Sequence, residues 1–181
     1  HARLSDTERA DMALRITHST SIIVHIVDEI LDISGKESIH YLDKTDLINC
    51  NEMARQMASP YMIKLGDIVV KLELQLKDNC CILVNRHEVE KILHHLLDNA
   101  VKFTDIPGTV QFLVETVSPG EDNRVIQFTV SDTGVGIDPE FLPKIFEAFT
   151  QEDASFTNRF GGSGVGLTAA YSIITGMGGR R

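Results

Sequence analysis

Two short glycine-rich stretches constrain this chain more than any other feature. The first, SDTGVGI, spans residues 131–137, and the second, FGGSGVGL, spans residues 160–167. Glycine lets a backbone turn tightly and approach a ligand, and a glycine loop that runs into a helix presents N–H groups to phosphate. The second stretch lacks the Lys-Ser or Lys-Thr of a P-loop. Gly164, Gly166 and Ala169 fit G-x-G-x-x-A, but no buried strand precedes them, so a dinucleotide site is a weak interpretation.

Composition limits the classes of function. The length of 181 residues suits one compact domain, or one domain carrying a helical appendage, and the composition of 43% hydrophobic and 24% charged residues is that of an ordinary soluble protein. The formal net charge of -9 disfavours a nucleic-acid partner, because such binding needs clustered Lys and Arg. No run approaches the roughly 18 apolar residues of a membrane span, so we expect no direct membrane contact. Cys50, Cys80 and Cys81 suit neither a disulfide framework nor a zinc site, which favours a reduced, cytoplasmic setting.

The first 35 residues predict a long helix. Ser5 and Glu8 form a capping box at its start, and Gly35 ends it. Ile16, Ile23 and Ile30 recur at heptad spacing, which favours a bundle with a partner helix or chain. A helix packed on its own domain is the alternative. We therefore divide the chain into a helix at 1–35 and a domain at 38–181.

The rest of the chain predicts mixed elements. We expect a short strand at 38–46, then a helix that starts near Thr45 or Asp46 and breaks at Ser59-Pro60. Alternating residues at 67–76 and the apolar stretch 80–84 predict a hairpin, and helical periodicity returns at 88–104. Two more strands, at 108–117 and 124–132, precede a final helix at 167–177. This order predicts an α+β fold, a two-layer α/β sandwich with a mostly antiparallel sheet under helices, after one protruding helix.

Two segments carry residues that could bind a ligand. On the helix at 88–104, His95, Asn99 and Lys102 fall within an arc of roughly 60°, beside the apolar face. An Asn oxygen can ligate a hydrated cation and a Lys can pair with an anion, although a solvated helix face explains the same pattern. Asp132 ends an apolar strand and could accept a hydrogen bond from an exocyclic amine. It could equally cap a turn.

The order of these motifs is more specific than any one of them. The chain carries N-x-x-x-K-F-T from Asn99, D-T-G-V-G-I from Asp132, F-x-x-F from Phe146 and G-G-S-G-V-G-L from Gly161. This order resembles the N, G1, F and G2 boxes of the catalytic ATP-binding domain of sensor histidine kinases, a Bergerat-type fold. The stretch IVDEILDIS is similar to the end of the second helix of the dimerization and phosphoacceptor hairpin in hybrid-type kinases of this family.

The resemblance implies a role for each matching residue. Asn99 would coordinate magnesium, Lys102 would meet the phosphates of ATP, and Asp132 would read the adenine amino group. His95 stands where the family usually has Asn, so the magnesium shell is expected to differ. The remaining residues implied in ATP binding are the neighbour of Lys102, the G1 glycines, the F-box lid residues and the G2 loop: Phe103, Gly134, Gly136, Phe146, Phe149, Arg159, Gly162, Gly164, Gly166 and Leu167.

The resemblance also implies a reaction and partners. The parent protein would use ATP and Mg²⁺ to phosphorylate a histidine, form a homodimer through the N-terminal helix and pass the phosphoryl group to a response-regulator receiver domain. It would act in the cytoplasm or as the cytoplasmic portion of an inner-membrane sensor. His1, His18 and His25 lack the family's phosphoacceptor pattern, and the two strands that follow the G2 helix in the family are not present. We therefore expect a fragment that does not phosphorylate itself.

Three alternatives remain. The chain could be a nucleotide-binding module that transfers nothing. It could be an ATPase of the gyrase, Hsp90 or mismatch-repair type, although that group carries a Glu base at the position of His95. Asp132-Thr133-Gly134 could also be an aspartic-protease triplet, which would need a symmetric dimer and would leave the other motifs unexplained.

Overall fold

The computed structural model describes residues 46–62, 68–76, 80–117, 125–151 and 164–177, together with Met12 and Val27. Its elements, in chain order, are β1 (Asp46–Asn49), α2 (Cys50–Met62), β2 (Ile68–Gln75), β3 (Cys81–Val84), α3 (Arg86–Lys102), β4 (Gly108–Val117), β5 (Val125–Asp132), the short 3-10 helix η3 (Leu142–Lys144) and α5 (Gly166–Gly176). Met12 and Val27 are helical and exposed. The predicted heptad pattern of 1–35 otherwise lies outside the described residues.

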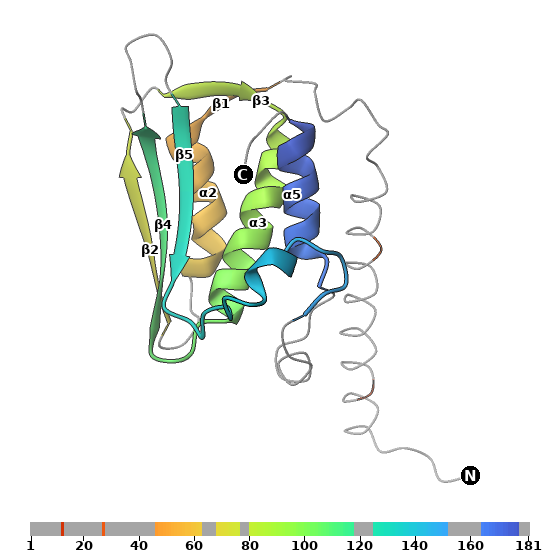
Figure 1. Ribbon diagram of the computed structural model, residues 1–181. Coiled ribbons are helices and arrows are strands. Elements are labelled where there is room, and N and C mark those ends of the chain that lie inside the picture. Colours follow the sequence, from red (N-terminus) through yellow and green to blue (C-terminus); the bar gives the residue numbers. More distant parts are fainter. Residues whose placement is uncertain are drawn as a thin grey trace, which may run out of the picture.

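The domain has two layers. One is a three-stranded sheet in the order β2-β4-β5, in which β2 and β4 are parallel and β4 and β5 are antiparallel. Helices α2, α3 and α5 lie side by side over one face of this sheet (Figure 1). The predicted two-layer sandwich is confirmed, and its sheet is mixed as expected. In the described part of the chain, no helix is both long and apolar enough to cross a membrane.

The core lies between the two layers. Phe112 and Val114 lie two residues apart on β4, so both point to the face of the sheet that the helices cover. Leu93 and Leu97 of α3 belong to the same buried cluster. All four side chains are almost fully buried, and such burial stabilises a fold by about 1.5–3 kcal/mol per side chain. The apolar face of α3 is thereby fixed against the sheet. Its borders point sideways, which places the predicted ligand-binding residues at the edge of the core.

The predicted hairpin at 67–84 is wrong. Strand β2 pairs with β4, whereas β3 pairs antiparallel with β1 in a separate two-stranded sheet. Alternation at period two is the same whichever partner a strand takes, so it identified both strands without identifying their neighbours. In Figure 1 the β1–β3 sheet crosses over the ends of the helices, apart from the main sheet.

The predicted limits of α2 also need correction. Asp46 begins β1 instead of capping the helix, and Asn49 provides the cap by accepting a hydrogen bond from the Glu52 N–H at 3.0 Å. The helix continues through Pro60 to Met62. Tyr61 holds this last turn against α3, because its hydroxyl donates to Asp98 and contacts Nδ1 of His94. Burial, with a smaller contribution from that bond to Asp98, raises the pKa of Tyr61, so the phenol stays a donor at neutral pH.

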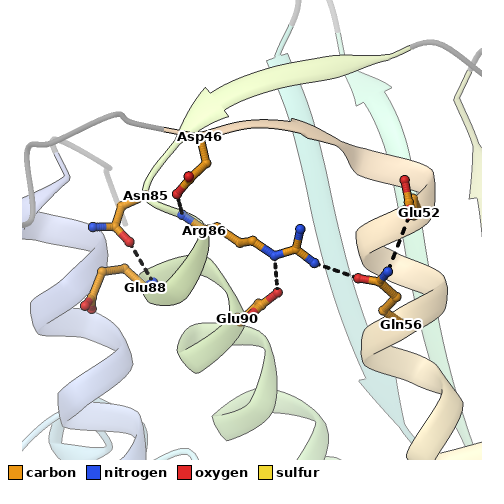
Figure 2. A network of polar contacts seen from close by, with 7 residues as sticks. All are labelled: Asp46, Glu52, Gln56, Asn85, Arg86, Glu88 and Glu90. Carbon is orange, nitrogen blue, oxygen red and sulfur yellow. Dashed lines mark hydrogen bonds and ion pairs between the residues drawn. The ribbon is translucent and has the colours of Figure 1, made fainter.

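A polar network joins β1, α2 and the start of α3 (Figure 2). The Arg86 N–H donates to Asp46 at 3.0 Å, and its guanidinium donates to Glu90 and to Gln56, each at 2.7 Å. These contacts are exposed, so each contributes little to stability. They nevertheless fix where α3 begins, and this helix of 17 residues has its other end at Lys102. The candidate ligand-binding residues lie toward that other end.

Candidate functional site

Helix α3 carries the first part of the site. Asn85 caps its start by accepting a hydrogen bond from the Glu88 N–H, and Leu93, Leu97 and Ala100 form the buried face. His95, Asn99 and Lys102 are partly exposed, on the border that the helical arc predicted. The ammonium of Lys102 lies 4.9 Å from the centre of the Phe103 ring, a cation–π contact. An amide, an imidazole and a cation therefore share one edge of the helix layer.

The end of α3 is joined directly to the first glycine turn. Phe103 is the C-cap residue, and its N–H donates to the Asn99 carbonyl at 3.0 Å. The Phe103 carbonyl in turn accepts a hydrogen bond from the Val135 N–H at 3.2 Å. One residue thus connects the helix that bears Asn99 to the turn that follows Asp132. Sequence reasoning missed this contact, because a backbone hydrogen bond leaves no mark on residue type.

Asp132 stands at the exposed end of β5, opposite Val110 of β4. Its Oδ1 accepts a hydrogen bond from the Gly134 N–H at 2.9 Å, which orients the carboxylate. Thr133 is tied to Thr109 by two bonds: its N–H donates to the Thr109 carbonyl at 3.1 Å, and its hydroxyl accepts from the Thr109 N–H at 3.0 Å. The strand end is therefore held rigidly, with the carboxylate at the surface instead of deep inside the domain.

The two glycines of this turn have different reasons to be there. A side chain at Gly134 would overlap the Phe103 carbonyl oxygen and lie 2.8 Å from Asp132 Oδ1, so the position is closed to any larger residue. Gly136 has a φ of +74° and open space around it, so its requirement is conformational.

The F-box residues follow at the base of the predicted lid. The ring of Phe146 stacks on Tyr171 of α5, with centroids 4.9 Å apart. Phe149 has an exposed ring and a φ of +63°, and its N–H donates to the Gly164 carbonyl at 3.0 Å. The chain therefore leaves this point at Gln151 and returns beside it at Gly164. Tyr171 was not predicted to belong here, although its aromatic ring within the final helix was a visible signal.

Stacking on Tyr171 should give Phe146 a measurable role in stability. We expect Phe146→Leu to lower the free energy of unfolding by about 0.5–1.5 kcal/mol beyond the loss of apolar area, because the ring pair is broken. Chemical denaturation of Phe146→Leu, of Tyr171→Leu and of the double variant that combines them measures the coupling energy between the two rings. Phe149→Leu is the control, since that ring is 65% exposed and should change stability little. Additive single effects would show that the rings do not interact.

No side chain of the helix caps the start of α5. Val165 occupies the N-cap position and makes no side-chain cap, while Gly164 turns the chain into the helix at a φ of +71°. Gly166 and Leu167 form the first turn, and Thr168 has a buried hydroxyl without a hydrogen-bond partner among the described residues. A helix N-terminus of this kind favours an anion.

Most of the predicted site residues lie in the described regions. The structure brings Asn99, Lys102 and Phe103 next to the turn of Asp132 through the Phe103 carbonyl, and α3 packs beside α5. Arg159 and Gly162, and the predicted lid at 151–162 except Gln151, lie outside the described residues.

Comparison with known families gives one match that covers more than half of the chain. The sequence model described as "Histidine kinase-, DNA gyrase B-, and HSP90-like ATPase" matches residues 84–181. That range contains α3, both glycine turns and α5.

Two curated relatives illustrate the similarity. The chain is 32% identical over 162 residues to the autoinducer 2 sensor kinase/phosphatase LuxQ of Vibrio parahaemolyticus, covering 88% of the chain and 19% of LuxQ. It is 30% identical over 183 residues to the signal transduction histidine-protein kinase BarA of Escherichia coli, covering 97% of the chain and 19% of BarA. The chain spans between 11% and 24% of the length of the curated relatives compared.

Solved structures agree on the fold. The chain matches full-length ShkA, solved in complex with AMPPNP, with a TM-score of 0.69 at 26% identity, covering 98% of this chain and 35% of ShkA. It matches the mycobacterial sensor histidine kinase MprB with a TM-score of 0.58 at 20% identity, covering 74% of this chain and 80% of MprB.

Proposed function

Given that this chain belongs to the histidine kinase-, DNA gyrase B- and HSP90-like ATPase family, and within it to the ATP-binding domains of sensor histidine kinases, we propose that its site binds ATP with Mg²⁺ for phosphoryl transfer to a histidine. The bond between the Val135 N–H and the Phe103 carbonyl carries this proposal. It joins the turn that follows Asp132, the residue expected to read adenine, to the end of the helix expected to hold the metal through Asn99.

The described residues suit these two ligands. Asn99 offers a hard amide oxygen, the ligand type that Mg²⁺ accepts. Among the described residues no three His, Cys, Asp or Glu side chains form a metal site, so water and phosphate oxygens would complete the shell. The metal, when bound, neutralises charge on the phosphates. His95, beside Asn99 on the same edge, would orient water in that shell.

The chain's own groups would position the nucleotide. Asp132 accepts a hydrogen bond from the adenine amino group, and Gly134 and Gly136 let the ring lie close to the turn. The Lys102 ammonium moves away from the Phe103 ring and pairs with the phosphate oxygens. The N–H groups at the start of α5 bind the phosphate tail, and Gly164 and Gly166 leave room for it. Phe103 and Leu167 flank the pocket, and Phe146 and Phe149 anchor the lid. We propose that Arg159 and Gly162 complete it.

A kinase is favoured over the related ATPases. Hydrolysis in the gyrase and Hsp90 group relies on a Glu base at the position where this chain has His95. An imidazole there binds and orients, but it does not reproduce a carboxylate base next to magnesium. The matched relatives LuxQ and BarA are named as sensor kinases, which supports the same choice.

The chain matches only a short part of its curated relatives, so we propose further roles for a whole protein that would contain it. It would form a homodimer through the helix at 1–35 and pass the phosphoryl group to the aspartate of a response-regulator receiver domain. A relative by fold, the histidine kinase ThkA, has been solved in complex with the response regulator TrrA. We place the activity in the cytoplasm.

The proposal predicts binding without self-labelling. Calorimetric titration of the 181-residue chain should show one ATP site whose affinity falls when Mg²⁺ is chelated. Incubation with radiolabelled ATP should leave no acid-labile phosphate on the chain, because His18 and His25 lack the adjacent Glu that holds an acceptor imidazole in its reactive tautomer. A supplied phosphoacceptor hairpin should become labelled.

The two readouts fail in different ways. If a folded chain binds no ATP, the site assignment is wrong. If it binds ATP but labels no supplied hairpin, the chain is a nucleotide-binding module without transferase activity. Stoichiometric label on His18 or His25 would show that the acceptor has been misplaced.

A further inference from the structure

Three cysteines lie near one another in sequence or space at the end of the domain away from the glycine turns, and two of them form a pair. Cys50 begins α2 and is fully buried, Cys80 is partly exposed, and Cys81 begins β3 and is exposed. The Cys50 N–H donates to the Cys80 carbonyl at 3.0 Å. This bond lies one residue beyond the last pair of the β1–β3 ladder, Asn49 opposite Cys81. Cys50 and Cys80 therefore face each other across the end of the ladder.

This placement suits a covalent bond between the two sulfurs. Extending the ladder register by one residue places Cys50 opposite Cys80. Residues opposite each other in antiparallel strands have Cα atoms about 4.5–5.5 Å apart, within the usual disulfide range of about 4.4–6.8 Å. The Cys80 thiol also lies close enough to Cys50 to contribute, after burial, to the raised pKa of the Cys50 thiol. Cys81 is separated from this pair, because successive strand residues point to opposite faces.

The two thiols differ in reactivity. Burial, and secondly the nearby Cys80, raises the pKa of Cys50 to about 12, so Cys50 remains a protonated thiol at neutral pH. Cys80 is partly exposed, so of these two sulfurs it is the one that a dissolved oxidant reaches first. Cys50 is held against it, in the position of a resolving thiol.

We propose that Cys50 and Cys80 form a site of reversible oxidation by peroxide, in which a disulfide joins the start of α2 to the residue that precedes β3. The Cys80 sulfur takes one oxygen of hydrogen peroxide and becomes a sulfenic acid as the O–O bond breaks, and the other oxygen leaves as hydroxide, which takes up the proton lost by the Cys80 thiol and becomes water. The Cys50 sulfur then bonds to the Cys80 sulfur as the S–O bond breaks, and the Cys50 proton and the departing oxygen leave as water. In total, two thiols and one peroxide give one disulfide and two waters.

The bond would strengthen the domain. It closes a loop that contains the rest of α2 and all of β2, residues 51–79, and so restricts the unfolded chain. It also locks the β1–β3 sheet to the helix whose buried residues Met53 and Met57 belong to the core. The oxidised chain should therefore melt at a higher temperature than the reduced chain.

Peroxide treatment of the folded 181-residue chain tests this site. We expect the intact mass to fall by two hydrogen atoms, a peptide linking Cys50 to Cys80 to appear without reductant, and Cys81 to stay open to alkylation. Dithiothreitol should reverse the mass change. Cys81→Ser should keep the cross-link and the rise in melting temperature, whereas Cys80→Ser should lose both. Both variants alter side chains outside the buried core, and circular dichroism confirms that each is folded.

Three results would overturn the proposal. One is a folded Cys81→Ser chain in which Cys80 proceeds to sulfinic acid without linking to Cys50. Another is a Cys80–Cys81 bond or an intermolecular Cys81 bond in its place. The third is a cross-link that forms only in denaturant, since the native placement of the two thiols would then have no part in it.

Discussion

Asp132→Asn should raise the dissociation constant for ATP by roughly 5- to 150-fold, a loss of about 1–3 kcal/mol. Asparagine keeps an oxygen that can accept from the Gly134 N–H, so the turn should be preserved. Its amide group, however, offers one acceptor where the carboxylate offers two, and the adenine amino group gains no charge-assisted bond from it. The loss therefore measures recognition of adenine. Calorimetry with ATP and ADP should show the same loss for both, because the contact is at the adenine end.

Asp138→Asn provides a matched control. Asp138 Oδ1 accepts a hydrogen bond from the Glu140 N–H at 2.8 Å, the same two-residue arrangement as at Asp132. The control therefore makes the same chemical change in the same local geometry, outside the G1 turn. It should leave the affinity for ATP within a factor of about two, since that corresponds to less than about 0.5 kcal/mol. Equal losses in both variants would mean that Asp132 acts on the turn and does not read the base.

The long periodic elements could be predicted because each carries its own signal. Leu93, Leu97 and Ala100 recur at helical spacing, and Phe112 and Val114 alternate along a strand. Burial of one face is all that such a pattern requires, so α3, β4, β5 and α5 appear close to their predicted positions.

Strand partners and helix limits depended on distant contacts. β2 pairs with β4, although β3 and α3 lie between these two strands in the sequence. Alternation of apolar and polar residues along a strand does not indicate which strand it pairs with. Pro60 was expected to end α2, because a proline loses its N–H bond and crowds the carbonyl of the preceding turn. The helix nevertheless continues, and Tyr61 compensates by bonding to Asp98 on α3.

For the site, the sequence identified residues better than it identified contacts. The order of the four motifs selected Asn99, Asp132 and the glycines. It did not predict that Phe103 joins the helix of Asn99 to the turn after Asp132, through its N–H to the Asn99 carbonyl and its carbonyl to the Val135 N–H. Nor did it predict the two bonds between Thr109 and Thr133, which hold the end of β5. The roles of the selected residues in binding ATP and Mg²⁺ remain predictions.

Gly134→Ala is expected to damage both folding and binding. The added methyl group would overlap the Phe103 carbonyl oxygen and press on Asp132 Oδ1 at 2.8 Å. That carbonyl belongs to the C-cap of α3 and accepts the Val135 N–H, so it has little freedom to move away. We expect a loss of about 1–3 kcal/mol in the free energy of unfolding, as for other overpacked positions. ATP affinity should also fall, because the turn that carries Asp132 must shift relative to Asn99.

Gly136→Ala separates this clash from a general loss of glycine flexibility. Gly136 has open space around it, so alanine there meets only the strain of a φ of +74°, about 1 kcal/mol. Urea denaturation and ATP titration of both variants give the comparison. The clash at Gly134 should cost more stability than the strain at Gly136. Gly134→Ala should also weaken ATP binding more than Gly136→Ala does, because only the clash at Gly134 moves Asp132. If the two variants behave alike, the close approach of Gly134 to Phe103 does not hold the two halves of the site in register, and the coupling between them must lie elsewhere.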